Sequence, residues 1–282
     1  MSLANQSDLL REAQAGGYAV GAFNVFNLET AQAVVAAAEA EHSPVILLMY
    51  DSHLDHFGVE ESAALGRMLA EKAQVPVAVH LDHGASFARV VRCIRAGYTS
   101  VMYDGSRLPF DENVAATRRI VEIAHHVDVS VEGEIGHVGR AAEGEERIEE
   151  WLTRPREAAD FVEATGVDCL AVAIGNAHGF YREEPKLDFA RLEAINRLVD
   201  VPLVLHGSSG IPEADLRRAI ELGIRKVNVG TETLTAFGAA LRDSLAQTSG
   251  PIRGLGQLSD ARAVMQGRVQ SYMQIFGSSG KA

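Results

Sequence analysis

Eight short apolar runs alternate along this chain with longer amphipathic stretches, and this alternation constrains the fold more than any other feature. The runs cover residues 18–24, 45–49, 77–81, 100–103, 129–134, 169–174, 203–206 and 226–229. Most of them are rich in β-branched side chains and free of charge, which is typical of parallel strands buried on both faces. The stretches between them have a helical pattern over residues 28–41, 60–72, 87–95, 110–126, 155–164, 189–198, 213–222 and 231–245.

This repeated order of strand and helix predicts an α/β fold, a closed (β/α)8 TIM barrel. No Gly-x-Gly-x-x-Gly turn follows a predicted strand, which argues against a doubly wound nucleotide-binding sheet. We expect one barrel domain over residues 1–282, because barrels of this class run to roughly 250 residues. Two segments lie outside the repeat. Residues 136–151 are an acid-rich insertion predicted to form a mobile active-site loop, and residues 250–282 are a C-terminal tail with a helix near 260–275.

Composition narrows the class of partner. The formal net charge of −12 argues against nucleic acid or an anionic membrane surface. No apolar run approaches the ~20 residues needed to span a bilayer, and the polar residues 1–17 lack the apolar core of an export signal. Cys93 and Cys169 have no Cys-x-x-Cys spacing, so we interpret them as reduced core thiols. These features together predict a cytoplasmic protein.

Three histidines stand at the ends of predicted strands, and glycine follows each of them: His83, His178 and His206. The carboxyl ends of barrel strands share one rim, so these side chains are expected to converge. Three neutral imidazoles form a common zinc site in which a fourth position stays open for substrate. Six other histidines are interpreted as surface or core residues; they are His42, His53, His56, His125, His126 and His137.

Other polar residues follow the same strand ends, namely Asn24, Tyr50, Asp51, Asp82, Asp104, Glu132, Glu134, Asn176 and Asn228. The loops after the seventh and eighth strands commonly bind phosphate in barrels of this class. Here they contain Gly207, Ser208 and Ser209, and then Asn228, Val229, Gly230 and Thr231. The second loop opens a predicted helix, whose N-terminal amides favour an anion. The sequence therefore predicts a phosphate site, which Gly179 is expected to join.

Seven strings occur in order along the chain: GAFN (21–24), LDHG (81–84), YDGS (103–106), VEGEIG (131–136), AIGNAHG (173–179), LHGSSG (205–210) and KVNV (226–229). With these strings the chain resembles the class II, zinc-dependent ketose-bisphosphate aldolases, and most of all their tagatose- and fructose-bisphosphate branch. The resemblance covers residues 21–245.

The resemblance implies a metal-dependent aldolase. Such an enzyme would reversibly cleave tagatose or fructose 1,6-bisphosphate, or a related sugar phosphate, to dihydroxyacetone phosphate and an aldehyde. It implies that His83, His178 and His206 hold Zn²⁺ and that Asp82 moves the proton of the C4 hydroxyl. It also implies a second or alternative metal position at Asp104 and Glu134, a monovalent cation such as Na⁺ or K⁺, and a homodimer or homotetramer.

The substrate contacts implied by the resemblance are Asn24, Tyr50, Gly179, Gly207, Ser208, Ser209, Asn228, Val229, Gly230 and Thr231. The chain departs from the family pattern at several positions. Ala142 stands where the family has a loop glutamate that acts as acid and base, and Glu143 follows one residue later as the candidate replacement. Tyr50 stands where relatives have Ser or Thr. Residues 51–53 after it are also atypical, and Phe26 replaces a usual polar residue, so we expect a reshaped aldehyde pocket.

Two alternatives stay open at this point. Ala142 and Tyr50 are compatible with a zinc- and sugar-phosphate-binding barrel that is non-catalytic or altered in specificity. A different metal-dependent TIM-barrel enzyme is the other alternative, although residues 22–25 lack the His-x-His of amidohydrolases. A Schiff-base aldolase is disfavoured, because the sixth strand has no lysine and Lys226 lies before the rim of the eighth.

Overall fold

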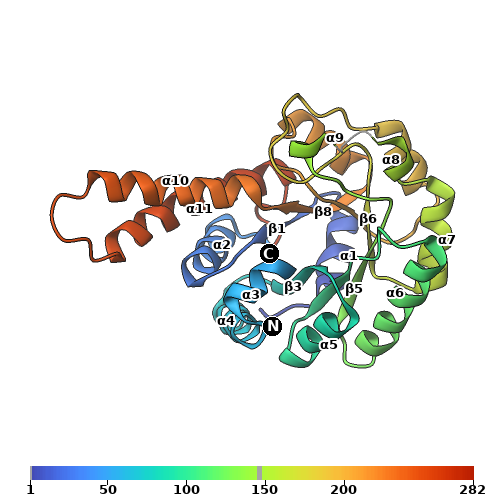
Figure 1. Ribbon diagram of the computed structural model, residues 1–282, viewed down its shortest axis with the longest axis horizontal. Coiled ribbons are helices and arrows are strands. Elements are labelled where there is room, and N and C mark those ends of the chain that lie inside the picture. The colour runs from blue at the N-terminus through green and yellow to red at the C-terminus, as the bar shows by residue number, and fades with distance from the viewer. Residues whose placement is uncertain (1, 145–147) are drawn as a thin grey trace.

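The computed structural model describes residues 2–144 and 148–282 (Figure 1). Within these residues, eight parallel strands close into a barrel in chain order, and the last strand pairs with the first. The strands are β1 (Val20–Asn24), β2 (Val45–Tyr50), β3 (Val77–Gly84), β4 (Ser100–Tyr103), β5 (Ser130–Ile135), β6 (Cys169–Val172), β7 (Leu203–Leu205) and β8 (Ile224–Val229). The predicted TIM barrel is confirmed.

Helices follow the strands and form the outer layer, as Figure 1 shows. They are α2 (Leu28–Glu41), α4 (Val59–Lys72), α5 (Phe87–Ala96), α6 (Phe110–His125), α7 (Pro155–Thr165), α8 (Phe189–Asn196), α9 (Glu213–Glu221) and α10 (Thr231–Gln247). Local chemistry sets their ends. The Asn27 side chain accepts a hydrogen bond from the backbone N–H of Thr30 at the start of α2. Gly97 and Gly166 end α5 and α7 in the left-handed conformation.

Side chains alternate between the inside of the barrel and the helix layer. On β3, Val79 and Leu81 belong to the core between strands and helices, whereas Ala78 belongs to the inner core. Because side chains alternate along a strand, His80 and Asp82 point to the inside of the barrel like Ala78. Residues of one parity therefore line the interior, and the last of them on each strand faces the rim where a ligand can bind.

Among the described residues, two helices were not predicted: the four-residue α3 (Leu54–Phe57) after β2, and a longer helix near the start of the chain. The helix α1 (Gln6–Gly16) begins at Asn5, whose side chain accepts a hydrogen bond from the backbone N–H of Ser7. Leu9 and Leu10 pack against the inner core of the barrel, beside residues from the early parts of the strands. This helix thus covers the end of the barrel opposite the strand ends that carry the predicted site.

The C-terminal tail packs on the barrel. The helix α11 (Leu255–Phe276) contains the predicted 260–275 helix and is longer at its start. It lies against α10 and α2, and the α10–α11 pair extends sideways from the barrel in Figure 1. No helix in residues 2–144 and 148–282 is long and apolar enough to cross a membrane.

The predicted loop over residues 136–151 includes 145–147, which lie outside the described residues. Its described parts contain two short 3-10 turns, η2 (Ala141–Glu143) and η3 (Glu149–Trp151). A short backbone bridge joins Arg140 to His178, so the first part of this loop is hydrogen-bonded to the segment after β6. Its mobility stays a prediction.

Candidate active site

The first of the three predicted ligands lies on a bulge. The register between β3 and β4 shifts between Leu81 and Gly84, and His83 has φ 50° there, in the left-handed region. Gly84 follows because a Cβ at that position would come within 2.5 Å of the Met102 carbonyl oxygen. The bulge aims His83 at the rim, where its Nδ1 lies 2.8 Å from Asp104 Oδ2. That hydrogen bond leaves Nε2 as the nitrogen with a free lone pair.

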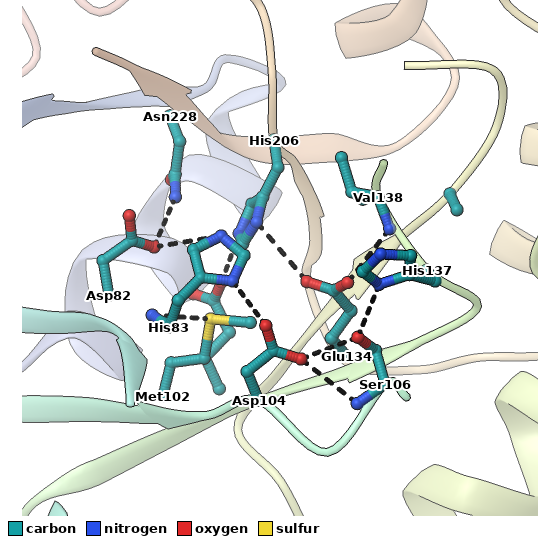
Figure 2. A network of polar contacts seen from close by, with 12 residues as sticks. Asp82, His83, Met102, Asp104, Ser106, Glu134, His137, Val138, His206 and Asn228 are labelled. Atoms are coloured by element: carbon teal, nitrogen blue, oxygen red, sulfur yellow. Dashed lines mark hydrogen bonds and ion pairs between the residues drawn. The ribbon is translucent and has the colours of Figure 1, made fainter. Parts of the chain in front are cut away.

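The other two histidines come from separate loops and meet the first. His178 follows β6, and its backbone N–H donates to the Gly139 carbonyl at 2.8 Å. His206 follows β7, and its Nε2 donates to Glu132 Oε1 at 2.8 Å. Its other ring nitrogen, Nδ1, faces Glu134 Oε2 at 3.5 Å (Figure 2). The ring of His83 lies 4.9 Å from that of His178 and 4.7 Å from that of His206, centre to centre. The predicted convergence is therefore present.

These side chains fit a divalent metal. Ligand atoms of His83, His178 and His206 all lie within 4.8 Å of one another, and a second such group consists of His83, Asp104 and Glu134. In the described part of the chain, His83 Nε2, His206 Nδ1 and Glu134 Oε2 are buried and accept or donate no hydrogen bond. Buried polar atoms are rarely left without a partner, so a cation that all of them face accounts for the arrangement.

The protonation states agree with this assignment. Burial lowers the pKa of His178 and of His206, which keeps both imidazoles neutral and able to bind a cation. Burial alone would lower the pKa of His83 as well, but the carboxylates of Asp82, Asp104 and Glu134 raise it to about 10. Burial and the neighbouring Asp104 raise the pKa of Glu134 to about 8. The carboxylates thus favour a positive charge on His83, which a metal ion bound at Nε2 would supply in place of the proton.

A buried ionic group lies behind His206. The carboxylate of Glu132 contacts His206 through one oxygen and Lys226 Nζ through the other, at 2.7 Å, and no atom of the three side chains is exposed. Gln6 of α1 also donates to it at 3.3 Å. Burial would raise the pKa of Glu132, but Lys226 and His206 hold it well below its usual range. Sequence reasoning placed Glu132 at the rim; that was wrong, because it lies one inward position before Glu134 on β5.

A cavity opens beside these candidate metal ligands at the strand ends. It is lined by Asn24, Tyr50, His53, Asp82, His178, Gly179, Gly207, Ser208, Ser209, Asn228, Gly230, Thr231 and Leu234. Asp82 is 3% exposed, and its Oδ1 accepts a hydrogen bond of 3.1 Å from Asn228 Nδ2. Figure 2 shows this pair on the side of His83 away from Asp104. The Asp82 carboxylate thus borders both the cavity and the candidate metal ligand His83.

The two predicted phosphate loops are joined at this cavity. Ser208 Oγ donates to the Asn228 carbonyl at 2.6 Å, and Ser209 Oγ accepts from the Glu232 backbone N–H at 3.1 Å. Gly207 is required here, because it has φ 62° and a Cβ would meet the Ala177 carbonyl oxygen at 2.2 Å. The start of α10, at Thr231, faces the same cavity. Its first backbone N–H groups are typical partners of an anion.

Most predicted site residues line the cavity, but the predicted contact Val229 and the candidate acid and base Glu143 do not. Val229 points away from it and lies in the core between strands and helices. Glu143 lies on η2 with its side chain 56% exposed, 3.8 Å from Arg140, and is not among the cavity-lining residues. Conversely His53, interpreted from sequence as a surface or core residue, lines the cavity. The signals for it in the sequence were its position directly after β2, three residues past Tyr50, and the departure of residues 51–53 from the family pattern.

Fold and site together define a metal-dependent enzyme of the (β/α)8 barrel class. The family model of class-II fructose-bisphosphate aldolases matches residues 4–281, and the chain belongs to this family. It is 45% identical to a fructose-bisphosphate aldolase of Geobacillus stearothermophilus, over 100% of this chain and 99% of that protein. It is 44% identical to a probable fructose-bisphosphate aldolase of Bacillus subtilis, over the full length of both.

Among solved structures, the YdjI aldolase of Escherichia coli K12 matches with a TM-score of 0.89 and 36% identity over 99% of each chain. A putative fructose-1,6-bisphosphate aldolase of Coccidioides immitis matches with a TM-score of 0.85 and 31% identity, over 98% of this chain and 97% of that one. The protein is thus a metal-dependent sugar-phosphate aldolase, a carbon–carbon lyase.

Proposed function

We propose that the protein is a zinc-dependent aldolase that reversibly cleaves tagatose or fructose 1,6-bisphosphate, or a related ketose phosphate. The products are dihydroxyacetone phosphate and an aldehyde. The observation that carries the proposal is the position of Asp82, between three converging imidazoles and the cavity that the two phosphate loops line.

The metal assignment follows from the donor set. His83, His178 and His206 supply three nitrogen ligands and leave a position open, which is typical of catalytic zinc. Asp104 and Glu134 provide an alternative position with His83, and a monovalent cation, Na⁺ or K⁺, is a further part of the proposal. When bound, zinc supplies a Lewis acid that stabilises the negative charge developing as the C3–C4 bond breaks.

The chain's own residues perform the remaining steps. In cleavage, the Asp82 carboxylate takes the proton of the C4 hydroxyl; the oxygen forms the aldehyde carbonyl, and the C3–C4 bonding pair stays on C3. In condensation, Asp82 returns this proton to the oxygen on C4. Asn228 orients Asp82 through its hydrogen bond of 3.1 Å. Gly179, Ser208, Ser209 and the first N–H groups of α10 hold the phosphate and thereby fix the triose half.

Glu143 is the proposed donor of the proton that C3 needs before the triose leaves. It is the carboxylate nearest in sequence to Ala142, and it lies on the loop whose backbone pairs with His178. Glu143→Gln is expected to lower kcat by about 10²-fold, the lower end for a general acid or base, because the pair on C3 is then protonated only by water. Release of the aldehyde is measured in a burst assay. Glu157→Gln on the exposed end of α7 is the matched control, and an unchanged kcat for Glu143→Gln would remove Glu143 from the mechanism.

The proposed function is tested by metal removal and a substrate panel. Ketose bisphosphates and ketose monophosphates are assayed by coupled detection of triose phosphate. Treatment with a chelator is expected to abolish cleavage, and stoichiometric Zn²⁺ is expected to restore it, because the Lewis acid is then replaced. Borohydride in the presence of substrate is the control: covalent trapping of substrate on the chain, or full activity in the chelated protein, would contradict the proposal.

The same proposal includes assembly and location. A homodimer or homotetramer is expected, measured by light scattering coupled to size-exclusion chromatography. A cytoplasmic location is supported by Cys93 and Cys169, which are both buried and free.

A further inference from the structure

His53 belongs to a row of packed rings that borders the cavity. It ends the short turn η1 (Asp51–His53), which follows β2 directly. Its ring centre lies 5.5 Å from that of Tyr50 and 6.1 Å from that of Phe26, edge to face in both cases. Phe26 packs in turn on Phe237 of α10, at 6.2 Å, and Tyr50 packs on His83, at 5.5 Å. These contacts fix the imidazole of His53 at the cavity wall.

The imidazole of His53 has hydrogen-bonding capacity that the protein does not use. Within the described residues, the ring nitrogen Nδ1 is buried and has no hydrogen-bond partner. Burial lowers the pKa of His53, so the ring is neutral, with one nitrogen that donates and one that accepts. A polar group left unpaired at the wall of a cavity is the kind of group that orients a ligand.

The electrostatics beside His53 favour an uncharged ligand group. The Asp82 carboxylate borders the same cavity as His53 and Tyr50, and Tyr50 is its paired residue on β2. The neutral imidazole and the phenol, which is uncharged at neutral pH, therefore lie next to a negative charge. Arg140, whose charge also reaches Tyr50, is ion-paired with Glu143 at 3.8 Å. A hydroxyl group, which can donate and accept, matches this wall better than an anion does.

The strands that carry Tyr50 and His53 indicate which half of the substrate these two side chains contact. The phosphate loops come from the segments after β6, β7 and β8, whereas Tyr50 and His53 come from the segment after β2. Asp82, the proposed base at C4, lies on β3 next to that segment, where Tyr50 is its paired residue. The atoms beyond C4 belong to the aldehyde product.

We propose that His53 is a specificity-determining residue whose imidazole hydrogen-bonds a hydroxyl group on the aldehyde half of the substrate. This inference rests on the proposed aldolase function. The preferred aldehyde substrates are then hydroxyaldehydes, and the ring of Tyr50 holds the imidazole of His53 in place.

The test uses condensation of dihydroxyacetone phosphate with two aldehydes of equal chain length. Glyceraldehyde carries hydroxyl groups, and propanal carries none. The ratio of kcat/KM for glyceraldehyde to that for propanal is expected to fall about tenfold or more in His53→Ala, because a site built to bond a hydroxyl discriminates against its absence. His53→Gln keeps a donor and an acceptor and is expected to retain most of the ratio. His56→Ala, an exposed histidine three residues later that does not line the cavity, is the matched control.

A partial reaction separates this inference from the proposed function. Exchange of the C3 proton of dihydroxyacetone phosphate with D₂O needs no aldehyde, and nuclear magnetic resonance measures it. Exchange in His53→Ala with a reduced aldehyde ratio supports the inference and shows that the variant is folded. Exchange with an unchanged ratio overturns the role of His53 and leaves the aldolase intact. Absence of exchange in the unaltered, zinc-loaded protein overturns the proposed function and the inference together.

Discussion

Asp82→Asn is expected to lower kcat for ketose phosphate cleavage by about 10³- to 10⁴-fold, the upper part of the range for a positioned general base. Asparagine has nearly the same shape and can keep a hydrogen bond to Asn228, but it cannot take the proton of the C4 hydroxyl. The side chain of Asp82 is 5% exposed, so bulk water does not readily take over its role. Steady-state cleavage kinetics of the zinc-loaded variant measure the effect.

Metal content distinguishes this role from a structural one. Asp82 belongs to neither group of candidate metal ligands, so Asp82→Asn is expected to retain zinc at the level of the unaltered protein, measured by atomic emission. Asp111→Asn, in the exposed first turn of α6 and away from the cavity, is the control and is expected to leave kcat unchanged. Loss of zinc with loss of activity would assign Asp82 to orienting His83, whose Nε2 lies 3.8 Å from it, instead of to proton transfer.

Lys226→Met is expected to lower the free energy of unfolding by about 3–5 kcal/mol, because it leaves the Glu132 carboxylate buried without its cation. The Lys226 ammonium lies 2.7 Å from that carboxylate, and neither side chain is exposed. Methionine matches the length of the lysine stem but has no charge. Urea unfolding of the zinc-loaded protein, followed by circular dichroism, measures the change.

Two further variants isolate the charge. Lys72→Met at the exposed end of α4 is expected to change stability by less than about 0.5 kcal/mol, as surface substitutions usually do. Adding Glu132→Gln to Lys226→Met removes the unpaired charge, so the double variant is expected to recover part of the loss. A loss below about 1 kcal/mol in Lys226→Met would show that the pair contributes little to stability.

Sequence patterns predicted the barrel because strand burial and helix amphipathicity are local signals. Every predicted strand is present, and the largest boundary error is at β3, which continues to Gly84 because a bulge extends it past Leu81. The helix α1 was missed because polar residues dominate its composition. Leu9, Leu10 and Ala13 do share a face in a helix, so this spacing was the available signal.

The convergence of the three histidines could be predicted for a similar reason: in a parallel barrel, a residue at a strand end reaches the common rim whichever strand carries it. His53 and Glu132 could not be assigned in the same way. His53 reaches the cavity because Phe26 and Tyr50 support it, and Phe26 itself packs on Phe237, more than two hundred residues away in sequence. The role of Glu132 depends on Lys226, which comes from a strand on the other side of the barrel.

The segment after β2 contributes to the aldehyde side of the cavity without taking part in metal or phosphate binding. The η1 turn and the helix α3 (Leu54–Phe57) contribute His53 to the cavity but supply none of the candidate metal ligands and no part of the phosphate loops. Arg89 of α5 holds this segment through Asp51 and Asp55, at 3.1 and 2.7 Å. Exchange of these seven residues between related barrels is therefore a way to graft a new aldehyde preference while the bond-breaking chemistry is inherited unchanged.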